Sequence, residues 1–263
     1  IAGLLLWIFV LVNILGTSFY ERTVIPLMFL MFGLGAIVII AGFFFTHEDF
    51  AVGLLAKEGR VHVSGPDSAF NVKTFMTAAA LLFASFIGFD SIAQAGGEAR
   101  NPSLSLPLAI AFSIIVVGSF YMLFTAAVYH AVPWTFIAQE AIDKDITAPG
   151  MFNYLLPSEL TIAIIAGAAI ALINDLPAML LSVSRLMFAW AKDGIFPSKA
   201  ADVHPRLHTP HLAILFSGGM ASIGIIGSHF AGDFFLGIDI MVTSMLVNFL
   251  LMCITLITLP KIN

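Results

Sequence analysis

Seven long runs of apolar residues set what this chain of 263 residues can fold into. About 20 helical residues, at roughly 1.5 Å each, cross the hydrocarbon core of a bilayer. The runs cover residues 1–16, 24–45, 75–97, 104–129, 160–184, 211–231 and 234–260. Because 60% of the residues are hydrophobic and only 10% are charged, a water-soluble core would not bury this much apolar surface. We therefore predict an all-α fold, a polytopic membrane helix bundle that forms a single transmembrane domain.

The two ends of the chain suggest a fragment of a longer protein. Ile1 already lies inside an apolar run, without an initiator Met and without the charged flank and cleavage site of a signal peptide. The last residues, 259–263, stop just beyond another run. We expect that both ends are cut and that the first run is short for this reason.

Lysine and arginine are unevenly divided between the two faces that seven alternating crossings would create. The richer face holds seven of the eleven, namely Arg22, Arg100, Arg185, Lys192, Lys199, Arg206 and Lys261. Because positive charge favours the cytoplasmic side, this face is predicted to be cytoplasmic and residue 1 to lie near the outside. The outer face then carries two long polar loops, at about residues 46–74 and 130–159.

Three carboxylates, Asp90, Asp175 and Asp239, fall inside the apolar runs. Facing lipid at mid-depth would cost each about 2.5–3.5 kcal/mol, so they should face protein or water. Asp239 lies near the end of its run and is assigned a structural role. Asp90 lies near the middle of its run and close to Gly88, which weakens a helix. We predict a broken helix there, whose freed backbone groups bind an ammonium or a carboxylate. The alternative is a glycine packing notch, with Asp90 bonded to a neighbouring helix.

Asp175 follows Asn174 and precedes Pro177, which lacks an amide hydrogen and leaves the carbonyl of Ile173 without its usual donor. The pattern predicts a second local distortion. An ion or substrate role for this segment and a structural kink are equally supported. Ser182, one to two turns further along, would supply a hydroxyl ligand or bond back to its own helix.

Other patterns have structural explanations. Ala163, Gly167 and Ala171 recur every fourth residue, which predicts a close-packed seam inside the bundle rather than a dimer face. His204 and His211 lie in a loop interrupted by prolines, and their surroundings do not favour a metal site. The chain carries no zinc-protease, nucleophile-elbow or phosphate-loop motif and no basic run for nucleic acid. We therefore expect no enzymatic activity, no cofactor and no nucleic-acid partner.

Three stretches of this chain resemble the amino acid, polyamine and organocation (APC) permease superfamily. Residues 86–91 (Phe-Ile-Gly-Phe-Asp-Ser), followed by residues 98–102 (Glu-Ala-Arg-Asn-Pro), are similar to the family's sixth helix and its cytoplasmic exit. Residues 184–197, with His204 to Pro210 after them, resemble its eighth helix and the following loop. Residues 13–16 (Asn-Ile-Leu-Gly) resemble the turn before its fifth helix, so the likeness covers nearly the whole chain.

The resemblance implies two inverted repeats of five helices, with the seven runs as helices four to ten. It implies that the broken sixth helix lines the substrate site and that the eighth helix lines the central cavity and the ion or proton region. The implied substrate-binding residues are Phe86, Ile87, Gly88, Phe89, Asp90 and Met179. The implied ion- or proton-coupling residues are Asp90, Asn174, Asp175 and Ser182.

From this resemblance we expect a secondary active transporter of the inner or plasma membrane that moves amino acids by alternating access, driven by a proton or sodium gradient. Its expected partners are an amino acid or amine substrate and the lipid bilayer. A polyamine carrier and a transporter-like nutrient sensor without flux are the alternatives, and a membrane enzyme is the weakest of the readings. The fragment by itself is not expected to transport. The sequence does not indicate an oligomeric state.

Overall fold

The computed structural model describes residues 2–62, 70–94, 96, 99, 101–143, 148–232 and 235–258. All regular elements in these residues are helical, which confirms the predicted all-α class. In chain order they are α1 (Ala2–Ile14), α2 (Thr17–Phe44), α3 (His47–Glu58), α4 (Val72–Leu82), η1 (Phe83–Phe86), α5 (Phe89–Gln94), α6 (Pro102–Ala131), α7 (Trp134–Asp143), α8 (Ala148–Met151), η3 (Phe152–Tyr154), α9 (Ser158–Lys192), η4 (Ser198–Ala201), α10 (His211–Ala231) and α11 (Phe235–Thr258).

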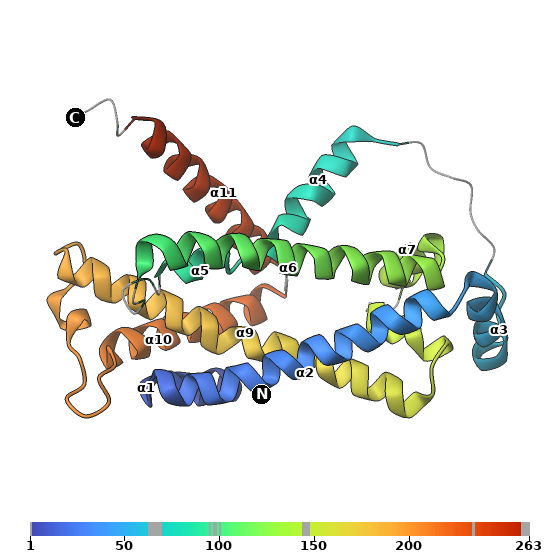
Figure 1. Cartoon of the computed structure of the whole chain (residues 1–263), viewed down its shortest axis with the longest axis horizontal. Coiled ribbons are helices and arrows are strands. Elements are labelled where there is room, and N and C mark those ends of the chain that lie inside the picture. The colour runs from blue at the N-terminus through green and yellow to red at the C-terminus, as the bar shows by residue number, and fades with distance from the viewer. Residues whose placement is uncertain are drawn as a thin grey trace.

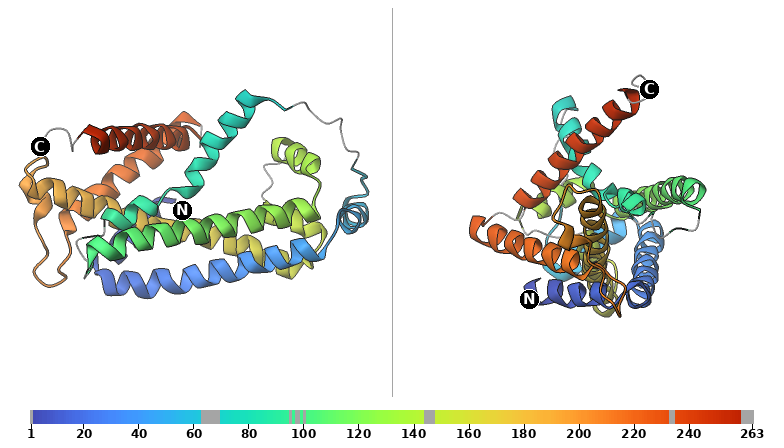
Figure 2. Two further views of the ribbon diagram at one scale, coloured as in Figure 1. Left: turned by 45° about the horizontal axis from the view of Figure 1, so that its top comes forward. Right: turned by 90° about the vertical axis from the view of Figure 1, so that its left-hand side faces the viewer.

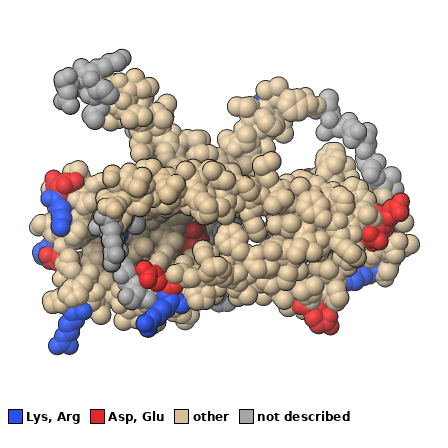
Figure 3. Space-filling view, in the orientation of Figure 1, with Lys and Arg blue, Asp and Glu red and all other residues tan. Residues whose placement is uncertain are grey.

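Five of these helices are long and apolar enough to cross a membrane. They cover Phe19–Phe44, Pro102–Ala131, Ser158–Lys192, His211–Ala231 and Ile240–Thr258, and α1 is a shorter apolar helix. In Figure 3 the charged side chains gather mostly toward the two ends of the long axis, and the visible middle is largely uncharged. This distribution suits a bundle with its middle in hydrocarbon, where a charge facing lipid is costly.

Helices α2, α6 and α9 run along the long axis and form the body of the bundle (Figure 1). α2 lies beside α6 along most of its length (Figure 2) and also packs against α9. Glycines allow these close approaches, because a Cβ on Gly42 would lie 2.5 Å from the carbonyl oxygen of Ala127 and one on Gly167 would lie 2.3 Å from Leu34 Cδ1. Of the predicted seam, Gly167 is buried against α2 and Ala171 is half-buried, whereas Ala163 is exposed, so the prediction holds for part of the seam.

Helix α1 packs against α9 and α10 through a buried apolar cluster. Its members are Leu6, Phe9, Val10, Val12, Leu180 and Ile214. The buried Asn13 side chain extends this contact, since its Nδ2 donates to the carbonyl oxygens of Phe9 at 3.0 Å and Pro177 at 3.2 Å. The turn before α2 is therefore tied to the middle of α9.

Two helices differ from the sequence-based expectation. α2 begins at Thr17, seven residues before the predicted run, because Glu21 and Arg22 are charged but are good helix formers. α9 continues without interruption from Ser158 to Lys192, so the distortion predicted at Pro177 does not break the helix. Pro177 is fully buried, and its carbonyl accepts the Asn13 amide of α1.

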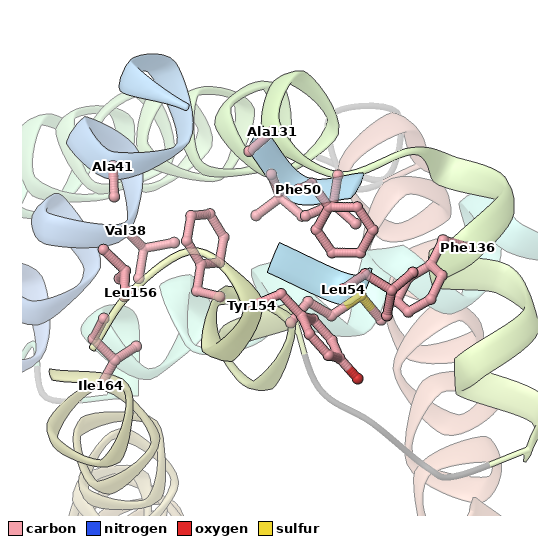
Figure 4. Close-up of a cluster of buried hydrophobic side chains, with 13 residues drawn as sticks. Val38, Ala41, Phe50, Leu54, Ala131, Phe136, Tyr154, Leu156 and Ile164 are labelled. Atoms are coloured by element: carbon pink, nitrogen blue, oxygen red, sulfur yellow. The ribbon is translucent and has the colours of Figure 1, made fainter. Parts of the chain in front are cut away.

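The two segments expected to be long polar loops instead contain short helices, and this prediction was wrong. α3, α7 and η3 cover one end of α2 and α6 and bury an apolar cluster there, which includes Phe50, Leu54, Phe136 and Tyr154 (Figure 4). The spacing of Phe50 and Leu54 gives α3 one apolar stripe. We call these three elements the cap. The expectation failed because the segments are too short and too polar to resemble spans, although their apolar residues are enough to pack on helix ends.

Local signals define the ends of α3. The Thr46 side chain accepts from the Asp49 amide at 3.4 Å, and Asp49 Oδ2 accepts from the Thr46 amide at 2.9 Å, which forms a capping box. The Thr46 hydroxyl also donates to Asp49 Oδ2, at 2.9 Å. The bond from the Thr46 backbone and then the one from its hydroxyl lower the pKa of Asp49. The helix stops at Gly59, whose φ of 67° is left-handed.

A charged network closes the cap. Arg60 bonds Glu140 and Glu58, both at 2.6 Å, and the Glu140 side chain is only 2% exposed. The Tyr154 hydroxyl donates to Glu58 Oε1 at 2.7 Å. Burial and then this bond raise the pKa of Tyr154 to about 12, while the bond to Glu140 raises the pKa of Arg60 above its usual value. The network thus joins α3, α7 and η3 through one arginine.

We expect Arg60→Ala to lower the melting temperature of the detergent-solubilised protein by several degrees, because it leaves the buried Glu140 carboxylate without its main counter-charge. Adding Glu140→Gln should restore part of the loss. Lys73→Ala, at an exposed position of α4, serves as the charge-matched control. Equal melting temperatures for the Arg60 and Lys73 variants would show that the network contributes nothing.

Candidate functional site

The segment between α4 and α5 is a helix break. α4 ends at Leu82, a short 3₁₀ turn covers Phe83–Phe86, and α5 begins at Phe89. Gly88 lies between them with a φ of 122°, a backbone conformation that L-residues with a side chain rarely adopt. No atom lies within 4 Å of where a Gly88 Cβ would stand, so the backbone conformation rather than space requires glycine. The predicted broken helix is confirmed.

A cavity of about 230 Å³ opens beside this break. Its described lining consists of Ser85, Phe86, Ile87, Gly88, Phe89 and Ile92 from the break, with Ser113, Ile114, Val117 and Tyr121 from α6. Four of the predicted substrate residues, 86 to 89, therefore lie around one cavity. The backbone of Asp90 belongs to the first turn of α5, but its side chain lies outside the described part of the chain, as does that of Asp239.

Tyr121 supports the break from α6. Its hydroxyl donates to the carbonyl oxygen of Ser85 at 2.9 Å, inside the 3₁₀ turn where regular helical bonding has ended. Its ring packs edge-on against Phe86, with centroids 5.6 Å apart and planes at 86°. Sequence reasoning missed Tyr121 because it belongs to no motif. The available signal was a phenol hydroxyl in the middle of a long apolar run, which needs a partner when it is buried.

Asp175, one of two acidic residues of α9, is within electrostatic range of this tyrosine. Asp175 interacts electrostatically with the phenols of Tyr121 on α6 and Tyr20 on α2. The neighbouring Asn174 is half-buried, and its buried Oδ1 has no hydrogen-bond partner among the described residues. Tyr121 is thus the side chain between the helix break and the polar residues of α9.

The other predicted residues of α9 are not at the break cavity. Met179 is half-buried and Ser182 is 6% exposed, and none of the described residues that line this cavity comes from α9. Among these α9 residues, Asp175 is within electrostatic range of Tyr121, whose hydroxyl bonds the break.

Helix α11 packs against both sides of the break. The Phe249 ring lies 5.9 Å from Phe83 at an angle of 86° and 5.4 Å from Phe89 at 15°, measured between centroids. α4 and α11 both extend from the bundle body near this point (Figure 1). Phe249 lies 160 residues along the chain from Phe89, so only the tertiary structure shows this contact.

A second, larger cavity of about 300 Å³ lies between α2, α6 and α9. Its walls are almost entirely apolar and include Phe32, Val38, Phe120 and Ile164. Val117 and Tyr121 line both this cavity and the break cavity. The two cavities are therefore neighbours across one face of α6.

The histidine loop contains an ordered turn. The rings of His204 and His211 lie 5.3 Å apart, and His204 Nδ1 accepts from the backbone amides of Arg206 and Leu207, each at 3.2 Å. In the part of the chain that the structure describes, no three His, Cys, Asp or Glu residues are grouped to hold a metal ion.

The sequence of this chain is similar to those of known amino acid transporters. The sequence profile of the amino acid permease family matches residues 1–261. The chain is 31% identical over 147 residues to the branched-chain amino acid permease BcaP of Bacillus subtilis, a match over 56% of this chain and 31% of that protein. It is 32% identical over 154 residues to human cationic amino acid transporter 4, covering 59% of this chain and 24% of the transporter.

A third relative is the uncharacterized transporter Rv1999c of Mycobacterium tuberculosis, 33% identical over 149 residues, which are 56% of this chain and 32% of that protein. The matched stretches span about a third or less of these relatives, so the activity of a complete transporter is a proposal for this chain. The family profile, in contrast, extends over nearly every residue. With its apolar helices, the chain belongs to the amino acid permease family and is an integral, multi-pass membrane protein.

Proposed function

We propose that the protein is a secondary active transporter that moves amino acids across the inner or plasma membrane by alternating access, coupled to a proton or sodium gradient. The observation that carries this proposal is the helix break at Gly88 with its adjoining cavity. Within a membrane, irregular backbone is tolerated where it lines a cavity, and its unpaired amides and carbonyls are suited to charged substrate groups. An amino acid presents both an ammonium and a carboxylate.

In this proposal residues 86 to 90 bind the substrate, whereas Met179 of α9, also predicted from the sequence, does not line the break cavity in this structure. The phenylalanines supply apolar walls, and the backbone around Gly88 supplies donors and acceptors. The names of two relatives support amino acids as substrates, because one is described as a branched-chain permease and the other as a cationic amino acid transporter. The seven crossings, read as helices four to ten with residue 1 outside, remain a prediction.

Coupling is proposed to involve Asp90, Asn174, Asp175 and Ser182. Asp175 is the first of these to test, because it is within electrostatic range of the Tyr121 phenol and the Tyr121 hydroxyl bonds the backbone of the break. A proton or cation that neutralised Asp175 would change the electric field at that hydroxyl. The occupancy of the coupling site and the conformation of the substrate site would then be linked.

We expect Tyr121→Phe to lower amino acid uptake about tenfold in proteoliposomes that contain the full-length protein, because it removes the hydrogen bond that holds the Ser85 carbonyl in the 3₁₀ turn beside the break. Asp175→Asn and Asp90→Asn should abolish stimulation by the gradient. The measurement is labelled amino acid uptake with and without a proton or sodium gradient. Tyr129→Phe, two turns further along α6 at an exposed position, is the matched control and should leave uptake unchanged.

Two results would contradict the proposal. Saturable amino acid binding without flux in the wild type would indicate a nutrient sensor, and competition by polyamines but not by amino acids would indicate a polyamine carrier. Uptake that is the same with and without either gradient would remove the coupling part of the proposal and leave the substrate part in place.

A further inference from the structure

We propose that the apolar cavity between α2, α6 and α9 receives the side chain of the transported amino acid, so that the preferred substrates have aliphatic or aromatic side chains. This inference rests on the proposed transport function. It assigns the selection of the substrate's side chain to a cavity that lies beside the helix break and not within it.

The chemistry of the cavity wall excludes a charged side chain. Tyr121 is the one polar residue among the described residues that line it, and none of them carries a charge or an amide. A lysine or arginine head group placed there would lose its water without gaining a partner, which is strongly unfavourable. Asp175 is not among the lining residues.

The position of the cavity suits the second half of a bound amino acid. Val117 and Tyr121 line both cavities, so a substrate whose ammonium and carboxylate groups bind at the break has the apolar cavity within reach of its side chain. The polar groups of the site lie on one side of Tyr121 and the apolar walls on the other. This is the distribution of polarity in an amino acid such as leucine or phenylalanine.

Small residues and aromatic rings define the shape of the cavity. The Phe32 and Phe120 rings form one wall, with centroids 5.1 Å apart and planes at 88°. Gly35 keeps room for the Phe120 ring, because a Cβ there would lie 2.4 Å from Phe120 Cζ. Ala168 and Ala171 line the α9 side, and the resulting volume of about 300 Å³ lies at the lower end of the range of ligand pockets. Filling the α9 side should therefore exclude large side chains first.

The test measures uptake of labelled leucine, phenylalanine, alanine and lysine by the full-length protein in proteoliposomes. We expect the wild type to prefer leucine and phenylalanine over lysine. Ala168→Leu should lower kcat/KM for leucine and phenylalanine by about 10-fold or more, while alanine changes by less than about 2-fold, since a misfit of one methylene in an apolar pocket is already worth about 10–200-fold. Ala169→Leu makes the same change at the next residue, which is exposed and does not line the cavity, and should leave all four rates unchanged.

The outcomes separate this inference from the function on which it rests. A wild type that takes up none of the amino acids overturns the proposed function. Preferred uptake of lysine overturns only the assignment of the cavity. An equal loss of leucine and alanine uptake in Ala168→Leu also overturns that assignment, because it would indicate that the cavity is a structural or lipid-filled space. If Ala168→Leu fails to accumulate in the membrane, Phe120→Ala provides a second test. It enlarges the cavity and should shift preference from leucine toward phenylalanine, and an unchanged preference overturns the assignment.

Discussion

Gly88→Ala is expected to reduce gradient-driven amino acid uptake by about 10-fold or more while the protein still accumulates in the membrane. At a φ of 122° a Cβ is strained at a cost of about 1–3 kcal/mol, and 1.4 kcal/mol corresponds to a factor of ten in an equilibrium. The segment can relieve this strain by rebuilding a regular helix across residues 86 to 89, which would remove the backbone groups that face the cavity. Uptake by proteoliposomes, normalised to the amount of inserted protein, measures the effect.

Gly219→Ala is the matched control for this experiment. Gly219 lies inside α10 without a positive φ, and a Cβ there would meet no atom within 4 Å. The same change of one methyl group should therefore leave uptake at the wild-type level. If Gly88→Ala also transports normally, the break is a packing feature and not part of the substrate site.

Gly53→Ala is expected to lower the stability of the cap strongly. A Cβ on Gly53 would lie 2.0 Å from the carbonyl oxygen of Tyr154, and a backbone atom cannot move away as a flexible side-chain tip can. α3 would have to separate from η3, with exposure of Phe50 and Leu54 and loss of the bond from Tyr154 to Glu58. We expect a loss of about 3 kcal/mol or more, at the upper end of the effects of single substitutions. The melting temperature in detergent checks this expectation.

The sign of the stability change in Gly53→Ala shows whether α3 packs closely on η3. In a helix interior, replacing glycine by alanine by itself stabilises by about 1 kcal/mol, so only a steric conflict turns the change into a loss. Gly33→Ala, in α2 with no atom within 4 Å of the new Cβ, should show the ordinary gain or no change. A Gly53→Ala protein as stable as the wild type would mean that α3 does not pack on η3 as closely as described.

What the sequence predicted correctly is local. The lengths of the apolar runs predict helices because a bilayer core satisfies no backbone hydrogen bonds, and this requirement acts on each segment separately. Gly88 could be identified as a break because its conformational freedom is a property of one residue. Gly167 could be placed in a helix seam for a similar reason, since close approach requires a small side chain wherever the partner lies.

The sequence was less informative where short segments or proline were involved. The cap helices were taken for loops because their apolar residues are few, and their burial depends on the ends of α2 and α6 to receive them. Pro177 lies inside one continuous helix, α9, and the contact of its carbonyl with Asn13, from a helix far away in the chain, could not be read from the sequence. In both cases the contact is a tertiary one.

The composition and order of residues therefore determined the helical class, the apolar segments and the position of the break in this protein. Only the tertiary structure decided which groups meet there: the Tyr121 hydroxyl with the Ser85 carbonyl, and the Phe249 ring with Phe83 and Phe89. The physical reason is that an apolar residue suits lipid and a neighbouring helix equally well. Hydrophobicity then does not reveal which face of a helix packs inward, and the contacts follow from the fit of ridges, glycines and hydrogen bonds in three dimensions.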